Sequence, residues 1–146
     1  MSYAQKSLLL FNHKNLDFQP MSILKNYIDN LKVQLDLLSL DVIELWSNDF
    51  LKLCKSKKQL FICGNGGSAG NAIHTSNDYS YGISSSKPPA MRVTALTANS
   101  SILTCLGKDV GYEVAFSEQL KTLGQSGDSF LVFSSGGNSP KVLEAF

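Results

Sequence analysis

Apolar residues recur at every third or fourth position along the first part of the chain and predict two helices. The first is expected over 22–38 and the second over 41–56, because a stripe with this period lies on one face of a helix. Asp41 is expected to cap the second helix, since its carboxylate can accept hydrogen bonds from free backbone N–H groups. Residues 1–19 show no clear period and are interpreted as an N-terminal arm. The two helices carry enough apolar surface that we expect the chain to self-associate.

Further along the chain the apolar residues form short continuous runs over 59–63, 91–96 and 129–133, which predict buried strands. Helical patterns follow, one beginning at Ser68 and one spanning 112–123. Strands that alternate with helices form βαβ units around a parallel sheet, so the predicted fold class is α/β. Three strands make a thin sheet. We therefore expect a domain that is incomplete at its C-terminus or is completed by a partner chain.

Composition supports a globular protein and narrows its partners. Apolar residues make up 43% of the 146 positions and charged residues 17%, whereas disordered chains are poor in apolar residues and rich in net charge. The formal net charge of +1 provides no broad basic surface, so nucleic acid is not expected as a partner. No apolar run approaches the roughly 18 residues of a membrane helix, so no membrane is expected. The three cysteines form no CxxC pair; each is expected to be buried, and they favour a cytoplasmic location.

Two glycine-rich loops are the main candidates for ligand binding. Gly64–Ser68 and Ser134–Ser139 each follow a predicted strand and precede a predicted helix. Such loops lie at the carboxyl ends of parallel strands, where open α/β sheets bind ligands. Glycine lets backbone N–H groups approach an anion, and serine hydroxyls and the helix N-terminus add further attraction. The alternative is two ordinary strand-to-helix turns, but two such loops in one short chain favour a phosphate site.

The surrounding residues narrow the identity of the phosphate ligand. Gly64, Gly66 and Ala69 match a dinucleotide fingerprint, but that motif needs a carboxylate about 20 residues later, at the end of the next strand. The next predicted strand runs into Leu96 and Asn99, with no carboxylate. Neither loop has the Gly-Lys-Ser/Thr of a Walker A motif. Dinucleotides and ATP are therefore disfavoured, and a small phosphorylated metabolite remains.

His74 and Asp78 are the candidates for chemistry. They stand four residues apart in the helix that follows the first loop, so they share a face, and we expect both to lie beside the phosphate. An imidazole and a carboxylate so placed can bind a divalent metal or transfer protons. The spacing alone favours the plainer alternative of a hydrogen-bonded histidine and a solvated aspartate.

Four segments together resemble one known family, the sugar isomerase (SIS) domain, and within it the phosphoheptose isomerases. They are GNGGSA at 64–69, His74, LGKDVGYE at 106–113 and SSGGNS at 134–139. The similarity runs from about Lys25 to Phe146, so 20–146 is interpreted as a SIS domain that lacks its C-terminal part. The resemblance implies a flavodoxin-like α/β domain preceded by helices that pack in a homotetramer. It also implies a cytoplasmic enzyme of heptose and lipopolysaccharide biosynthesis, which often binds zinc and interconverts sedoheptulose 7-phosphate and D-glycero-D-manno-heptose 7-phosphate.

The resemblance also assigns roles to individual residues. Substrate contacts are implied for Asn65, Gly66, Gly67, Asp78, Lys108, Asp109, Ser134, Ser135, Gly136 and Ser139, with the serines holding the phosphate. His74 and Asp78 are implied to bind zinc, and Asp78 is implied to move the proton. Ketose–aldose isomerisation moves a proton between adjacent carbons through an enediol-type intermediate, and it needs a base within reach of both carbons. Binding the distant phosphate supplies energy that positions those carbons.

The sequence departs from the family's pattern at four places. Asp78 stands where the family has glutamate, which removes about 1 Å of reach, a displacement that can cost on the order of 100-fold in rate. Gly136 replaces a serine of the phosphate loop, and Lys108 replaces an asparagine. Nothing in 1–146 matches a second histidine and a glutamine of the family. A non-catalytic SIS protein that binds a sugar phosphate or a partner protein is therefore the alternative function, and a purely structural α/β fragment is the third.

Overall fold

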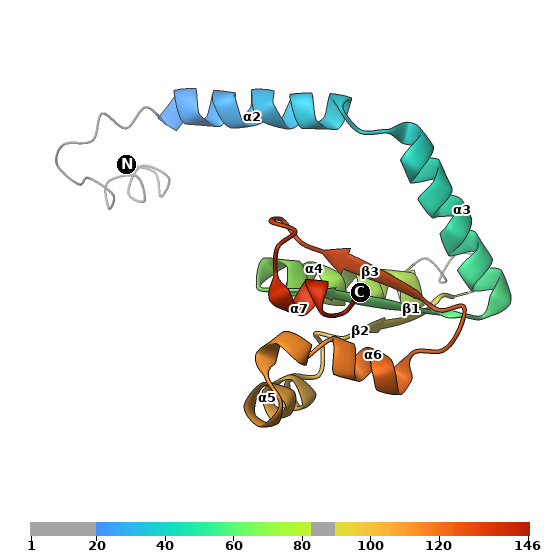
Figure 1. Ribbon diagram of the computed structural model, residues 1–146. Coiled ribbons are helices and arrows are strands. Elements are labelled where there is room, and N and C mark those ends of the chain that lie inside the picture. The colour runs from blue at the N-terminus through green and yellow to red at the C-terminus, as the bar shows by residue number, and fades with distance from the viewer. Residues whose placement is uncertain (1–19, 83–89) are drawn as a thin grey trace, which may run out of the picture. The chain divides into compact units, whose positions relative to one another are not determined.

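The computed structural model describes residues 20–82 and 90–146, so the predicted arm over 1–19 lies outside the described residues (Figure 1). The chain divides into two compact units, Met1–Asp41 and Val42–Phe146. In the first unit, helix α2 (Pro20–Asp36) begins and ends two residues before the predicted bounds, and none of its residues is buried. Among the described residues, no helix combines the length and the apolar character needed to cross a bilayer.

Helix α3 (Leu40–Ser56) begins one residue earlier than predicted. Asp41 therefore lies inside its first turn and is not its N-cap, although a carboxylate there still interacts favourably with the helix dipole. Leu53 is buried, and Phe50 and Cys54 pack beside it against the sheet. The C-terminal half of α3 is thus a layer of the α/β unit.

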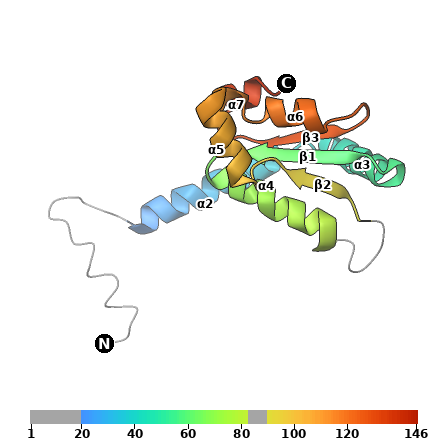
Figure 2. The ribbon, with the colours of Figure 1, turned by 90° about the horizontal axis from the view of Figure 1, so that it is seen from below.

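Three parallel strands form the sheet, as the sequence predicts. They are β1 (Gln59–Gly64), β2 (Arg92–Ala95) and β3 (Ser129–Phe133), in the spatial order β2-β1-β3 (Figure 2). The central strand β1 is almost entirely buried, because helices cover both of its faces. Parallel strands place all their carboxyl ends at one edge, so the loops that follow β1 and β3 are neighbours.

Side chains on the two faces of β1 belong to two separate hydrophobic cores. Leu60 and Ile62 point to the face that α3 and α4 (Gly67–Asn77) cover. Phe61 and Cys63 point to the opposite face and pack with residues of α5 (Ser100–Asp109), α6 (Ser117–Leu123) and the segment after α7 (Pro140–Leu143). Figure 2 shows α4 on one side of the sheet and α5, α6 and α7 on the other. The unit is therefore a three-layer α/β/α arrangement, consistent with the flavodoxin-like expectation.

Two helical segments differ from the sequence prediction. Helix α5 was not predicted, although Asn99 marks its start by accepting hydrogen bonds from the N–H groups of Ser101 and Ile102. The helix expected over 112–123 is broken into a 3-10 turn, η3 (Tyr112–Val114), and α6. The break falls at Ala115 and Phe116, which are both buried.

Candidate functional site

The two glycine loops meet in one cavity of about 280 Å³ at the carboxyl ends of β1 and β3. It is lined by Asn65, Ser68, Phe133, Ser134, Ser135, Gly136, Asn138 and Ser139. The Nδ2 of Asn65 donates a hydrogen bond of 2.7 Å to the Oγ of Ser139, which ties the first loop directly to the second. The structure therefore brings together most of the predicted phosphate-binding residues. Ser68 and Asn138 also line the cavity and were not predicted, although both lie within the two loop motifs.

Each loop depends on glycine for a definite reason. Gly66, the N-cap of α4, has φ 54° and ψ −122°, a backbone conformation that residues with a side chain rarely adopt. In the second loop Gly137 has φ 65°, and its N–H donates to the Oγ of Ser134 at 3.0 Å. Gly64 has no room for a side chain, because an added Cβ would lie 2.6 Å from the backbone of Ser68. The glycines therefore allow each loop to turn tightly between its strand and its helix.

Among the described residues, no charged side chain lines this cavity. An anion bound there would be held by hydroxyl groups, by the amide of an asparagine and by backbone N–H groups. The N-terminus of α4 opens on the same edge, and its dipole adds partial positive charge. The cavity thus suits a phosphate recognised by hydrogen bonds.

His74 and Asp78 face one another, as the sequence predicts. The Nε2 of His74 lies 3.4 Å from the Oδ2 of Asp78, and their side chains are 78% and 51% exposed. Asp78 is the first residue of a π-helical turn, η2 (Asp78–Gly82), that continues α4. The N–H of Met91, directly before β2, donates to the carbonyl of Tyr79, so the pair approaches the amino end of β2. The expectation that both residues lie beside the phosphate is wrong, because α4 runs back from the carboxyl edge of the sheet.

An open strip nevertheless connects the phosphate loop to this pair. Gly67, Gly70, His74 and Asp78 are spaced three or four residues apart and so follow one face of α4. A Cβ added to either glycine would meet no atom within 4 Å. With a rise of 1.5 Å per residue, His74 lies roughly 10 Å along the helix from Gly67. A ligand anchored at the loop can therefore reach the pair only if it is extended.

Lys108 and Asp109 form a third group at the end of α5, where both are exposed. The thiol of Cys105 donates to the Oδ2 of Asp109 at 3.4 Å, and this hydrogen bond with the adjacent negative charge raises the pKa of Cys105.

Cys105 is exposed, so the expectation that every cysteine is buried is wrong for it; Cys63 is buried as expected. Burial raises the pKa of Cys63 to about 12, although nearby Lys141 opposes the shift.

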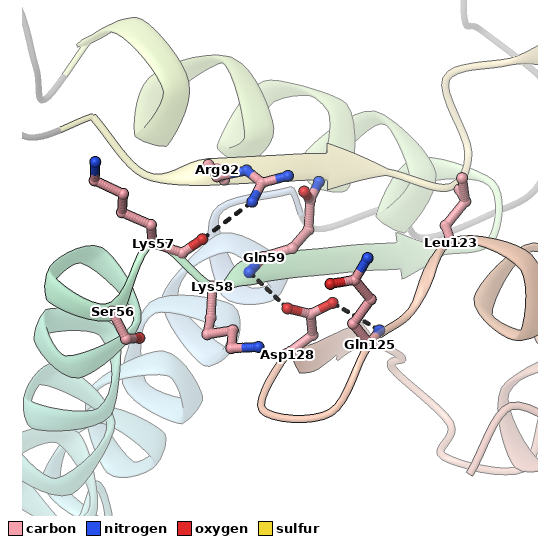
Figure 3. Close-up of a pocket in the computed structure, with 8 residues that line it drawn as sticks. All are labelled: Ser56, Lys57, Lys58, Gln59, Arg92, Leu123, Gln125 and Asp128. Atoms are coloured by element: carbon pink, nitrogen blue, oxygen red, sulfur yellow. Dashed lines mark hydrogen bonds between the residues drawn. The ribbon is translucent and has the colours of Figure 1, made fainter.

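A second polar pocket lies at the amino ends of the three strands, where hydrogen bonds connect neighbouring segments (Figure 3). Asp128 accepts hydrogen bonds from the N–H groups of Gln59 and Gln125, both at 2.9 Å, and these bonds lower the pKa of its carboxyl. Arg92 donates to the carbonyl of Lys57 at 3.1 Å. The C-termini of α3 and α6 also end at this pocket, and their dipoles favour cations over anions. The basic side chains of Lys58 and Arg92 therefore donate to carbonyl groups that follow the two helices.

Comparison with known proteins identifies the family. The family described as the SIS domain matches residues 25–146, most of the chain. The chain belongs to the SIS domain family. The phosphoheptose isomerase of Nitratidesulfovibrio vulgaris is 42% identical over 104 residues, which cover 71% of this SIS domain chain and 49% of the relative. The phosphoheptose isomerase of Campylobacter concisus is 43% identical over 91 residues, which cover 62% and 48% of the two chains. The chain thus spans about half the length of these relatives.

Solved structures support the same fold. Phosphoheptose isomerase GmhA from Neisseria gonorrhoeae superposes with a TM-score of 0.74 at 27% identity, covering 88% of this SIS domain chain and 67% of the other. A phosphoheptose isomerase from Francisella tularensis superposes with a TM-score of 0.79 at 22% identity and supports the fold alone. The α/β sheet and the N-terminal helices predicted from the sequence are therefore confirmed.

The side chains that could act as metal ligands bear on the expectation that the protein binds zinc. His74 and Asp78 supply one nitrogen and one carboxylate on the same face of the helix. Catalytic zinc takes three protein ligands and structural zinc takes four. Within 20–82 and 90–146, no group of three or more His, Cys, Asp or Glu side chains is placed to hold a metal ion. The described residues therefore do not make a zinc site by themselves.

Proposed function

We propose that this SIS domain binds sedoheptulose 7-phosphate and takes part in its isomerisation to D-glycero-D-manno-heptose 7-phosphate. Relatives of about 40% identity that are named phosphoheptose isomerase support this assignment. The observation that carries it is the open strip of α4, which leads from the phosphate loop to the His74–Asp78 pair.

The length of that strip matches the substrate. In sedoheptulose 7-phosphate the phosphate is on C7 and the reacting carbons are C1 and C2. Carbon–carbon bonds of about 1.5 Å give an extended span of roughly 8 Å between them. This is close to the rise of α4 from Gly67 to His74, roughly 10 Å. A sugar held by its phosphate at the loop would thus present C1 and C2 to His74, whose Nε2 lies 3.4 Å from the carboxylate of Asp78, whereas a triose phosphate would fall short.

The proposed chemistry needs two proton transfers at that end, one between carbons and one between oxygens. A carboxylate at Asp78 removes a proton from C1, an enediol forms, and the proton returns to C2 while the C1 hydroxyl proton moves to the C2 oxygen. His74, 3.4 Å from that carboxylate, orients it. Asp109 would accept hydrogen bonds from the sugar hydroxyls, and Lys108 would stand beside it. Zinc remains part of this proposal only as an added ion, and no step depends on it.

A non-catalytic SIS protein that binds a sugar phosphate is the second candidate. It is favoured by the short carboxylate at Asp78 and by the lack, within the described ranges, of a third His, Cys, Asp or Glu placed with the pair to hold a metal ion. Self-association through the exposed apolar residues of α2, with a homotetramer as the expected form, fits either candidate. A cytoplasmic location, implied by the resemblance, also remains a prediction.

Hydrogen exchange at the substrate separates the two candidates. Sedoheptulose 7-phosphate is incubated with the protein in D₂O, with and without zinc, and followed by NMR. Deuterium incorporation at C1 or C2 is expected, and Asp78→Asn should abolish it. Asp49→Asn is the matched control, because Asp49 lies on the surface of α3 in an exposed pair with Lys52. Broadening of the sugar resonances without exchange would refute the isomerase and support the binding protein.

A further inference from the structure

Lys141 is a buried lysine with no carboxylate partner among the described ion pairs. The residue is only 7% exposed. Its Nζ lies 3.2 Å from the centroid of the Tyr112 ring and 5.3 Å from that of Phe116. An ammonium group over an aromatic face is attracted by the negative charge of the ring, and the attraction grows when water is excluded.

This contact joins two segments of the proposed site. Lys141 follows Ser139, the last residue of the phosphate loop, by only two positions. On the other side, the Tyr112 ring packs against Gly107, where an added Cβ would lie 3.1 Å from its Cδ2. Gly107 directly precedes Lys108 and Asp109, the residues expected to contact the sugar. The ring therefore contacts both Lys141, just after the phosphate loop, and the C-terminal end of α5.

Packing alone does not explain a lysine at this position. A buried ammonium group without a carboxylate loses hydration, so an apolar side chain of similar length would fill the same space at lower cost. The charge is offset by two aromatic faces that come from the segment after α5. The cost of burying the charge is thus linked to the position of Tyr112.

We propose that Lys141 is a positioning residue that transmits phosphate binding at the 134–139 loop to Lys108 and Asp109 at the C-terminal end of α5. When the loop closes on phosphate, α7 moves with it, and the ammonium group carries the Tyr112 ring and the end of α5 that packs against this ring. The inference deepens the proposed function and rests on it for the identity of the sugar. The link itself involves phosphate alone and is testable without the sugar.

The test uses the full chain labelled with 3-fluorotyrosine, with the Tyr112 resonance assigned from Tyr112→Phe. Titration with inorganic phosphate is expected to shift this ¹⁹F resonance in the unsubstituted chain. In Lys141→Met, phosphate should still bind with an affinity within about twofold, measured by ³¹P line broadening, but Tyr112 should no longer respond. Lys141→Arg should restore the response. Lys121→Met, an exposed lysine on α6, is the matched control and should leave the response unchanged.

Affinity for sedoheptulose 7-phosphate provides a second readout. Loss of the cation should weaken sugar-phosphate binding by about 3- to 30-fold, the range expected for a cation–π contact, while phosphate affinity changes little. Tyr112→Leu should have the same effect, and the double variant should be no worse than either single one.

Each result has a definite meaning. No phosphate-induced shift at Tyr112 in the unsubstituted chain overturns the inference. A shift that persists in Lys141→Met also overturns the inference. If Lys141→Met instead loses phosphate and sugar-phosphate affinity equally and has a lowered melting temperature, the lysine is merely structural and the inference is overturned. A Lys141-dependent shift without any binding of sedoheptulose 7-phosphate leaves the link intact and refutes only the proposed substrate.

Discussion

The close approach of α4 to β1 at Gly64 makes Gly64→Ala a direct test of how the phosphate loop depends on this contact. Gly64 is the buried last residue of β1. An alanine Cβ there would lie 2.6 Å from the carbonyl carbon and oxygen of Ser68 and 2.8 Å from its Cβ. Two of these three atoms are backbone, so no side-chain rotation relieves the clash. The first turn of α4 would have to move away from the strand.

Overpacking of this kind costs about 1–3 kcal/mol, and each 1.4 kcal/mol is a factor of ten in the folding equilibrium. Because Ser68 lines the cavity, the displacement should also lower phosphate affinity. Urea unfolding followed by circular dichroism measures the first effect, and titration with inorganic phosphate measures the second. Gly70→Ala is the matched control, since its Cβ would meet no atom within 4 Å, and it should stabilise the helix by about 0.5–1 kcal/mol.

Gly64→Ala with unchanged stability and unchanged phosphate affinity would refute the reasoning. It would mean that the strand and the helix are not in contact at this point. Loss of stability with normal phosphate affinity would refute only the link between this contact and the cavity.

Three further predictions concern single side chains. Asp128→Asn should lower the free energy of unfolding by about 1 kcal/mol, because an amide replaces one of two accepting oxygens on a partly screened carboxylate. Because folding lowers the pKa of Asp128, the difference in unfolding free energy between the two proteins should be complete above about pH 4 and should vanish as the pH falls through the folded pKa. Urea unfolding at a series of pH values measures this difference, and a difference that does not change with pH would contradict the prediction. Ser139→Ala removes the acceptor of the Asn65 amide and should weaken phosphate binding about fivefold by titration, whereas unchanged affinity would place the phosphate elsewhere. Asp78→Glu restores the reach of the longer carboxylate and should raise deuterium exchange into the sugar by up to about 100-fold; an unchanged rate would show that reach is not limiting.

The strands and glycine loops could be predicted from the sequence because their signals are local. The run 129–133 became β3 with the same bounds, and the runs before it became β1 and β2 within two residues. An apolar run that ends in glycine depends only on neighbouring residues. The i, i+4 spacing of His74 and Asp78 likewise predicted that they share a face of the helix, and their side chains lie 3.4 Å apart.

Tertiary structure alone decided the features that depend on direction and on distant packing. The position of Asp78 away from the phosphate follows from α4 running back along the sheet. The break of the helix expected over 112–123 falls at Phe116, which is buried in the core beneath β1 and so depends on tertiary packing. The contact of Lys141 with Tyr112 joins residues 29 positions apart, and no local pattern in the sequence marks it. Local periodicity sets which elements form, whereas the order and direction of packed elements set which residues share a site.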